Sequence, residues 1–227
     1  MLSLPRALAL ALGQLGDPAI VRILGKTAVL TLAIFAAGGV GFYVALDAMF
    51  GDRALAGLGA LAAALVTLVA GWFLFRVVSL FVLQFFAEDV VRAVEKRHYP
   101  QAAATARPIG FGEELRGALR SLARTLVANI LALPVAGLLL LSGFGPALVF
   151  LFVNAWLIGR ELQDLVWLPH RADAAELAPI SGGTRLLLGG AVVALLAIPF
   201  LNLLAPIVGA ACATHLVHRA REKELHA

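Results

Sequence analysis

The chain has 227 residues, of which 61% are hydrophobic and 14% are charged, with a formal net charge of +4 and a mean hydropathy of +0.93. A soluble domain is about half apolar and about a quarter charged, so this composition excludes an ordinary soluble fold. It indicates a single integral membrane domain covering residues 1–227. The basic excess does not indicate nucleic acid, because the basic residues cluster beside apolar runs and favour anionic lipid headgroups instead.

Two apolar segments open the chain. Leu2–Leu15 is too short to span a bilayer and is expected to lie at the membrane interface. A new helix is expected to start at Asp17 and Pro18, with Asp17 as its N-cap and Pro18 in its first turn. The uncharged run that follows, Thr27–Leu46, has close to the roughly 20 residues that a transmembrane helix needs.

A second spanning helix is expected after a tight outward-facing turn at Asp47–Arg53. Its uncharged run, Ala54–Phe75, is also long enough to cross the bilayer. Because no Gly or Pro interrupts Trp72–Tyr99, we expect this helix to continue amphipathically along the inner surface to about His98. The flanking basic residues place this surface, and both termini, on the cytoplasmic side.

The two remaining uncharged runs, Thr125–Gly159 and Leu186–Thr214, are each too long for one straight span and short for two. The first contains a strong turn signal at Ser142–Pro146. The second is broken by Pro199 and Pro206, and a broken helix is tolerated in lipid only against protein or a wet cavity. The economical interpretation is two short helical hairpins that enter the membrane and return, and the alternative is four complete spans. The expected fold is therefore an all-α, polytopic membrane protein with two long transmembrane helices, two hairpins and amphipathic interfacial helices.

Three stretches of the sequence resemble one family. They are Leu4–Pro18, Asn154–Glu161 and, most specifically, Ile198–His215, which reads IPFLNLLAPIVGAACATH. Together they are similar to the CysZ / etoposide-induced protein 2.4 family. The resemblance implies a bacterial inner-membrane permease that assembles as a homo-oligomer, with two long spanning helices and two half-penetrating hairpins. The characterised bacterial branch carries sulfate into the cell.

The sequence departs from the sulfate branch after Pro18. That branch has a Gly-Leu-Arg segment associated with sulfate binding, whereas this chain has Ala19-Ile20-Val21-Arg22. Arg22 is near the expected place, so the resemblance makes it a candidate for substrate binding. Family membership is therefore better supported by the sequence than the identity of the anion.

The basic residues are the main candidates for binding a small inorganic anion. Arg116, Arg120 and Arg124 form a stripe on an amphipathic helix, and guanidinium groups match the geometry of oxyanions. Arg22 and Lys26, just before the first span, could form an anion-binding site at its end. The alternative for both groups is a cytoplasmic face that anchors the protein on lipid phosphates. Asn202, between two prolines, is a further candidate for lining a path.

No catalytic residue, metal site or cofactor is predicted. The chain has no GxSxG, HExxH or P-loop motif, and its single cysteine, Cys212, excludes a cysteine-rich metal site. His215 and His218 are spaced to share a metal, but two ligands do not make a site and no accompanying acidic ligand is evident. His218 is expected at the interface near Arg219. The leading hypothesis is an oxyanion permease, and the alternative is a membrane scaffold that transports nothing.

Overall fold

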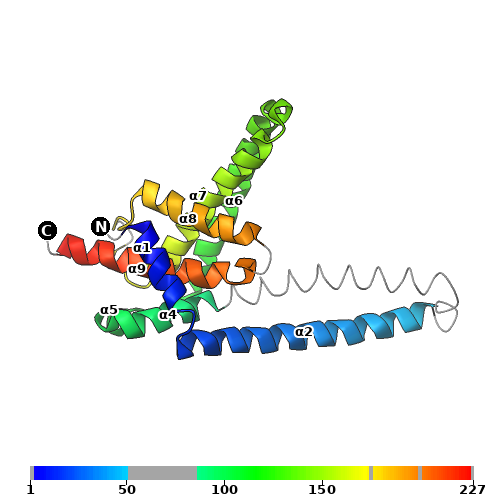
Figure 1. The fold of residues 1–227 in the computed structure, drawn as a ribbon, viewed down its shortest axis with the longest axis horizontal. Coiled ribbons are helices and arrows are strands. Elements are labelled where there is room, and N and C mark those ends of the chain that lie inside the picture. The colour runs from blue at the N-terminus through cyan, green and yellow to red at the C-terminus, as the bar shows by residue number, and fades with distance from the viewer. Residues whose placement is uncertain (1–2, 51–85, 174–175, 199–200, 226–227) are drawn as a thin grey trace. The chain divides into compact units, whose positions relative to one another are not determined.

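The computed structural model describes residues 3–50, 86–173, 176–198 and 201–225, and in these residues all regular structure is helical. In chain order the elements are α1 (Leu4–Gly13), α2 (Pro18–Phe50), α4 (Ala87–His98), α5 (Pro100–Thr105), α6 (Phe111–Leu138), η2 (Leu140–Ser142), α7 (Gly145–Trp167), α8 (Gly182–Ala197), η3 (Leu201–Leu203) and α9 (Ala205–Leu225) (Figure 1). Among the described residues, three helices are long and apolar enough to cross a membrane, within Pro18–Gly41, Phe111–Leu138 and Gly145–Trp167. The expected all-α, polytopic membrane fold is confirmed.

The chain divides into two compact units. One comprises Met1–Asp17 together with Ala87–Ala227, and the other is Pro18–Phe86. In the second unit α2 begins at Pro18, as the sequence predicts, and continues as helix to Phe50. The expected second span, Ala54–Phe75, lies outside the described residues.

The prediction of one uninterrupted helix up to about His98 is wrong, because the helix is interrupted at Phe86. This residue lies in a turn, and α4 begins after it at Ala87. The helix then starts with Glu88 and Asp89 and ends with Lys96, Arg97 and His98. Acidic residues in the first turn and basic residues in the last turn both complement the helix dipole. This charge pattern accounts for an independent short helix here.

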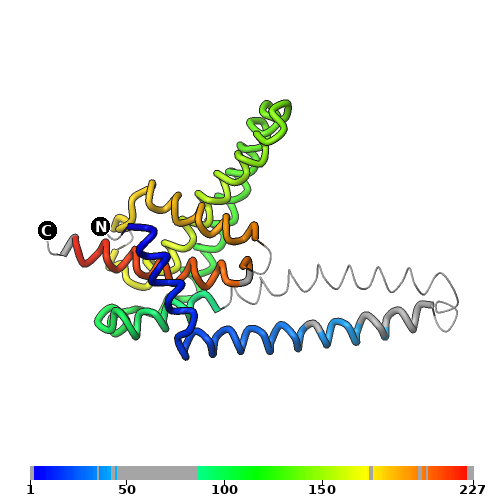
Figure 2. Tube along the Cα trace, in the orientation of Figure 1, coloured from blue at the N-terminus to red at the C-terminus, as the bar shows by residue number. Residues whose placement is uncertain are grey.

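The core of the larger unit is built around α9. Every residue from Ala205 to His218 is buried, and the helix contacts α1, α4, α7 and α8. Small side chains make this possible, because Gly209 and Ala210–Ala211 let neighbouring helices approach closely. A Cβ atom at Gly209 would lie 2.9 Å from Val192 Cγ2 on α8. Figure 2 shows α8 and α9 running side by side.

Glycines also set the approach of α7 to α8. A Cβ atom at Gly189 would collide with the backbone carbonyl oxygen of Ala155, and one at Gly159 would collide with that of Arg185. The two helix backbones are therefore in direct contact, as in membrane proteins that pack helices through small residues. This contact fixes the start of α8 against the charged end of α7.

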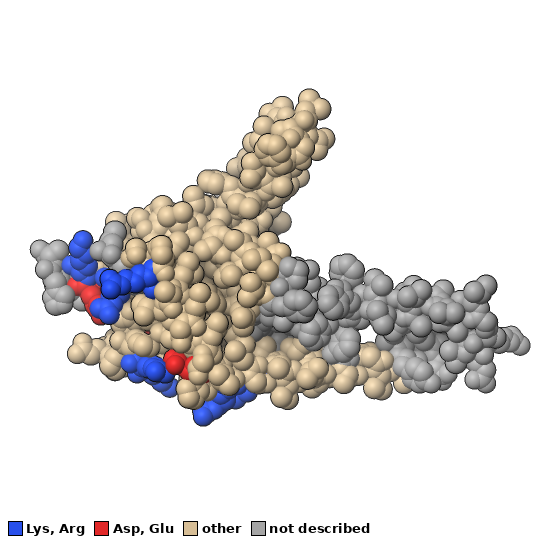
Figure 3. Space-filling model, in the orientation of Figure 1, with Lys and Arg blue, Asp and Glu red and all other residues tan. Residues whose placement is uncertain are grey.

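The first predicted hairpin is confirmed. Helices α6 and α7 run side by side to a common turn (Figure 1). In this turn Gly143 has φ of 78°, which favours glycine, and Ser142 Oγ accepts a hydrogen bond from the Gly145 amide at 2.8 Å. Figure 3 shows no charged residue on the visible surface of the distal part of this pair. An apolar surface of this kind is suited to lipid.

The helices of this hairpin are longer than the uncharged arms suggested. With 28 and 23 residues, α6 and α7 extend to about 42 and about 35 Å, more than the roughly 30 Å of the bilayer core. The difference arises because both helices continue into charged segments at their base. Their lengths permit a full crossing. In the second hairpin α8 has only 16 residues. Its helix ends at Ala197 and α9 begins at Ala205, so the helix is interrupted where the prolines predict.

The contact between α7 and α8 gives a first testable prediction. Gly189→Ala places a methyl group against the Ala155 carbonyl oxygen and is expected to cost about 1–3 kcal/mol of stability. Gly190→Ala is the matched control, since its Cβ atom would meet the Ala155 Cβ at an ordinary 3.9 Å. Thermal unfolding in detergent measures both. Equal melting temperatures for the two variants would contradict the direct backbone contact.

Candidate functional site

A charged groove of about 1520 Å³ lies at the base of the α6–α7 hairpin. Its walls come from α4, the start of α6, the end of α7, the loop that follows α7 and the start of α8. Nine basic and seven acidic side chains line it. This density of charge contrasts with the apolar distal half of the same hairpin.

Part of this charge is neutralised within the groove. Arg107 donates two hydrogen bonds to the Glu113 carboxylate, both at 2.9 Å, and Arg171 donates a third at 2.8 Å. Arg124 and Arg160 flank Asp164, each with its nearest nitrogen 3.9 Å from the same carboxylate oxygen. These contacts hold the two helices and the following loop together, and each carboxylate offsets one of the two guanidinium charges beside it.

Other basic groups in the groove keep free hydrogen-bond donors. Arg116, Arg120 and Arg185 line it without an ion-pair partner among the described residues. The Nε atoms of Arg160 and Arg185 are buried, and neither has a hydrogen-bond partner in the described part of the chain. An unpartnered buried N–H is costly. An anion in the groove could satisfy these donors.

The structure brings some of the predicted site residues together and leaves others apart. Arg116, Arg120 and Arg124 all line the groove. Asn202 does not: it lies in η3, buried with 6% of its surface exposed, at the break between α8 and α9. Arg22 and Lys26 are exposed on α2, in the other unit.

The other two asparagines in the apolar runs play a local role. Asn129 and Asn154 each donate a hydrogen bond to the carbonyl oxygen four residues earlier in their own helix, at 2.8 and 2.7 Å. Each side-chain amide therefore has a hydrogen-bond partner within its own helix, and neither hydrogen bond joins two helices.

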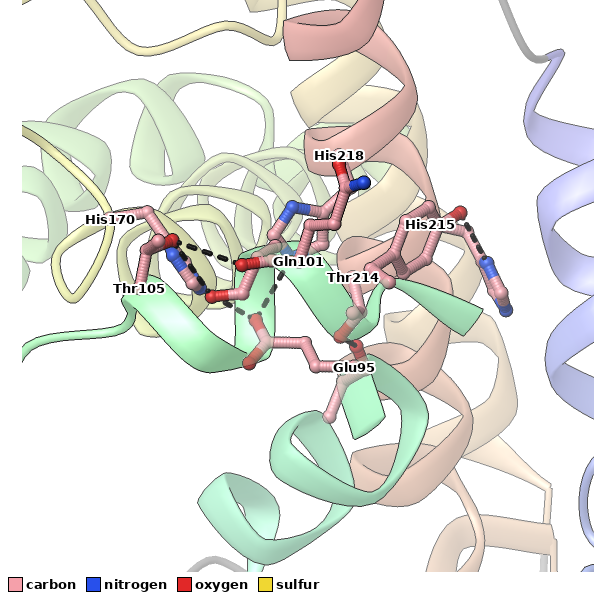
Figure 4. A network of polar contacts seen from close by, with 10 residues as sticks. Glu95, Gln101, Thr105, His170, Thr214, His215 and His218 are labelled. Carbon is pink, nitrogen blue, oxygen red and sulfur yellow. Dashed lines mark hydrogen bonds and ion pairs between the residues drawn. The ribbon is translucent and has the colours of Figure 1, made fainter. Parts of the chain in front are cut away.

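A second polar site is buried beside the groove, where α4 meets α9 (Figure 4). One oxygen of Glu95, Oε1, is 2.8 Å from His170 Nε2 and 2.9 Å from His218 Nε2. Glu95 comes from α4, His170 from the segment after α7, and His218 from α9. Burial alone would raise the pKa of Glu95, but the hydrogen bonds from the two histidines outweigh it and lower the pKa to about 2. The carboxylate is therefore ionised at neutral pH.

A neighbouring network joins α1 to the same two helices. The side-chain amide of Gln14 donates to Nε2 of His98 at 2.9 Å and to Nε2 of His215 at 2.8 Å. His215 Nδ1–H then donates to the Tyr99 hydroxyl at 2.8 Å. Burial, together with the positive charge of Arg219 and the neighbouring His98 and His218, lowers the pKa of His215 to about 4. A neutral His215 ring is consistent with an Nε2 atom that accepts the hydrogen bond from Gln14.

This second site was not predicted from the sequence. His218 was expected at the interface, yet only 3% of it is exposed, and it faces Glu95. The acidic partner that the histidine pair lacked comes from 123 residues earlier in the chain. One signal was available: Glu95 follows Val91 at i+4 and Val94 directly, so it falls on the apolar face of α4. A charged residue on such a face indicates a buried polar partner.

The fold and the groove define the class of protein to which this chain belongs, a multi-pass α-helical membrane protein with a basic groove at the base of a helical hairpin. The sequence model described as sulfate transporter CysZ/etoposide-induced protein 2.4 matches residues 7–206, and the chain belongs to this family. No curated protein and no solved structure matches this chain. The description of this family names a sulfate transporter.

The Gln14 network gives a second testable prediction. Gln14→Met keeps the length of the side chain but leaves His98 and His215 without their donor. His215 is buried whereas His98 is exposed. Since a buried group left unsatisfied costs about 1–3 kcal/mol, we expect the loss at His215 to lower the melting temperature in detergent. Gln101→Met on α5 is the matched control, because the Gln101 side chain is exposed. Unchanged stability of the Gln14 variant would show that the network does not hold α1 in place.

Proposed function

We propose that this protein conducts a small inorganic oxyanion, with sulfate as the first candidate, across the bacterial inner membrane. The observation that supports this most directly is the groove, where the buried Nε atoms of Arg160 and Arg185 have no hydrogen-bond partner among the described residues. Guanidinium groups bind tetrahedral oxyanions through several N–H donors at once. Membership of a sulfate transporter family supports the same substrate class.

The position of the groove supports a transport role over that of a scaffold. An oxyanion that leaves water must exchange its hydration for fixed positive charge and hydrogen-bond donors. Arg120 and Arg185 offer both at the base of helices that are long enough to cross the bilayer. A scaffold that transports nothing has no need of unpaired donors in a groove of this size. The substrate is therefore expected to pass along the face of α6 that carries Arg116, Arg120 and Arg124.

We further propose that the functional form is a homo-oligomer surrounded by lipid, as the family resemblance implies. Many large apolar side chains of the α6–α7 hairpin are exposed, among them Leu138, Leu141 and Phe144. Exposed apolar surface of this extent must be covered by lipid or by another copy of the chain.

The third testable prediction concerns flux. Arg120→Gln removes a charge that has no ion-pair partner in the described part of the chain, and a charge-assisted hydrogen bond contributes about 1.5–3 kcal/mol. We therefore expect radiolabelled sulfate uptake into proteoliposomes, per folded molecule, to fall at least about tenfold. Arg120→Lys is expected to retain more activity. Combining Arg120→Gln with Arg185→Gln should deepen the loss.

Arg6→Gln on α1 is the matched control, because Arg6 is exposed and lies outside the groove. Its uptake should equal that of the wild type. Wild-type vesicles that take up no more sulfate than empty ones, or groove variants that transport as well as the Arg6 variant, would contradict the proposal. The first of these results would favour the scaffold.

The fourth testable prediction concerns topology. We propose that both termini are cytoplasmic, because basic residues flank the apolar runs on that side. Cys212 is fully buried, so single cysteines at Ser3 and Lys223 can be labelled over a low background. Both should be protected from a membrane-impermeant thiol reagent added to intact spheroplasts and become reactive after lysis. Labelling of either position from outside would contradict this orientation.

A further inference from the structure

Three potential metal ligands converge in the buried site between α4 and α9. Glu95 Oε1, His170 Nε2 and His218 Nε2 all lie within 4.8 Å of one another. The two imidazole nitrogens point at the same carboxylate oxygen, from 2.8 and 2.9 Å (Figure 4). The three side chains come from segments 75 and 123 residues apart. The fold therefore brings three potential metal ligands together from distant parts of the sequence.

The site is buried and lacks a permanent positive charge. Only 4% of the Glu95 side chain is exposed, 1% of His170 and 4% of His218. Within the described residues, Glu95 is paired with these histidines and with no lysine or arginine. A buried carboxylate needs a compensating cation. Either a proton on an imidazole or a metal ion could supply the charge.

The chemistry of the ligands favours a particular class of metal. Two imidazoles and one carboxylate form a set that binds Zn²⁺ in proteins and leaves a further position for water. Ca²⁺ and Mg²⁺ prefer oxygen ligands throughout, and imidazole suits the later divalent transition metals. From these observations we propose that Glu95, His170 and His218 bind one divalent transition-metal ion of the zinc type.

The existing geometry needs little adjustment to accept the ion. Bonds of about 2.0–2.1 Å to zinc at a tetrahedral angle separate two ligand atoms by about 3.3 Å. The observed separations of 2.8 and 2.9 Å would therefore widen by a few tenths of an ångström as the metal replaces the shared protons. Glu95 also lines the charged groove, through which water can reach the open position.

A bound ion would cross-link three elements. It would hold α4 and the segment after α7 against α9, the buried core helix of the larger unit. The same segment carries Arg171, which bonds to Glu113 in the groove. The metal would therefore stabilise the position of the segment that forms one wall of the groove. This inference does not depend on the anion proposed as substrate, because the ligands and their burial are independent of the free arginine donors.

The test uses the full-length protein in detergent after treatment with a chelator that is then removed. Zn²⁺ is titrated in competition with a chromogenic zinc indicator at neutral pH. We expect one tight site per chain. Glu95→Gln and His170→Ala each remove one ligand and are expected to weaken binding at least about 100-fold, beyond the effect of losing an outer-shell partner.

His98→Ala is the matched control, because His98 lies on α4, three residues after Glu95, but belongs to the Gln14 network. It should bind zinc as the wild type does. Added Zn²⁺ should raise the melting temperature of the wild type and of the His98 variant, and not that of the His170 variant. A wild type without a saturable site, or Glu95 and His170 variants that bind as tightly as the wild type, would overturn the proposal.

A measurement on the wild type alone covers the case in which the ligand variants do not fold. Co²⁺ added to the stripped protein should give the intense visible absorption of a four- or five-coordinate ion, saturating at one equivalent and removed by one equivalent of Zn²⁺. The weak spectrum of hexa-aqua cobalt throughout the titration would refute a site built from two imidazoles and a carboxylate.

Discussion

The structure of the larger unit depends on one constraint, the complete burial of α9 from Ala205 to His218. A helix enclosed on all sides must offer small side chains where its neighbours approach and must satisfy each polar group it carries. The Ala/Gly-rich first half meets the first requirement against α7 and α8. In the second half, Thr214 bonds back to the Ala210 carbonyl oxygen at 2.8 Å, and the two histidines need partners from other helices.

Those partners organise the rest of the unit. His215 is hydrogen-bonded to Gln14 and Tyr99, and His218 is hydrogen-bonded to Glu95. Polar contacts as well as apolar packing therefore hold α1 and α4 against α9. Buried polar contacts are directional, and an unmade one is costly. They specify one arrangement of otherwise similar apolar helices. Apolar packing alone would distinguish poorly between alternative docking positions of short helices such as α1.

The charged groove and the apolar hairpin are two halves of the same pair of helices. The distal half of α6 and α7 exposes apolar residues, while the base carries Arg124 and Arg160 on either side of Asp164. Because these charges lie where the hairpin meets α8, the close backbone contact at Gly159 and Gly189 also sets the position of Arg185. The packing of small residues therefore determines where the free guanidinium donors lie.

Several features of this protein follow directly from its sequence. Its composition specifies a membrane protein, Pro18 marks the start of a helix, Ser142–Pro146 marks a turn, and the proline-bounded segment near Asn202 marks a break. The stripe of Arg116, Arg120 and Arg124 was also visible, because helical periodicity is a local property. These features follow from the preferences of neighbouring residues, which do not depend on the remainder of the fold.

Contacts between residues far apart in the sequence depend on the tertiary fold. The sequence gives no measure of the distance between Glu95, His170 and His218, and nothing local shows that Asn202 lies outside the groove that holds the arginines. The uncharged runs also understated the lengths of α6 and α7, because both helices continue into charged segments that pair across the base of the hairpin. Contacts of this kind depend on how whole helices pack together. The position of each helix is set by many contacts between small residues around α9, and these contacts involve several elements of the chain.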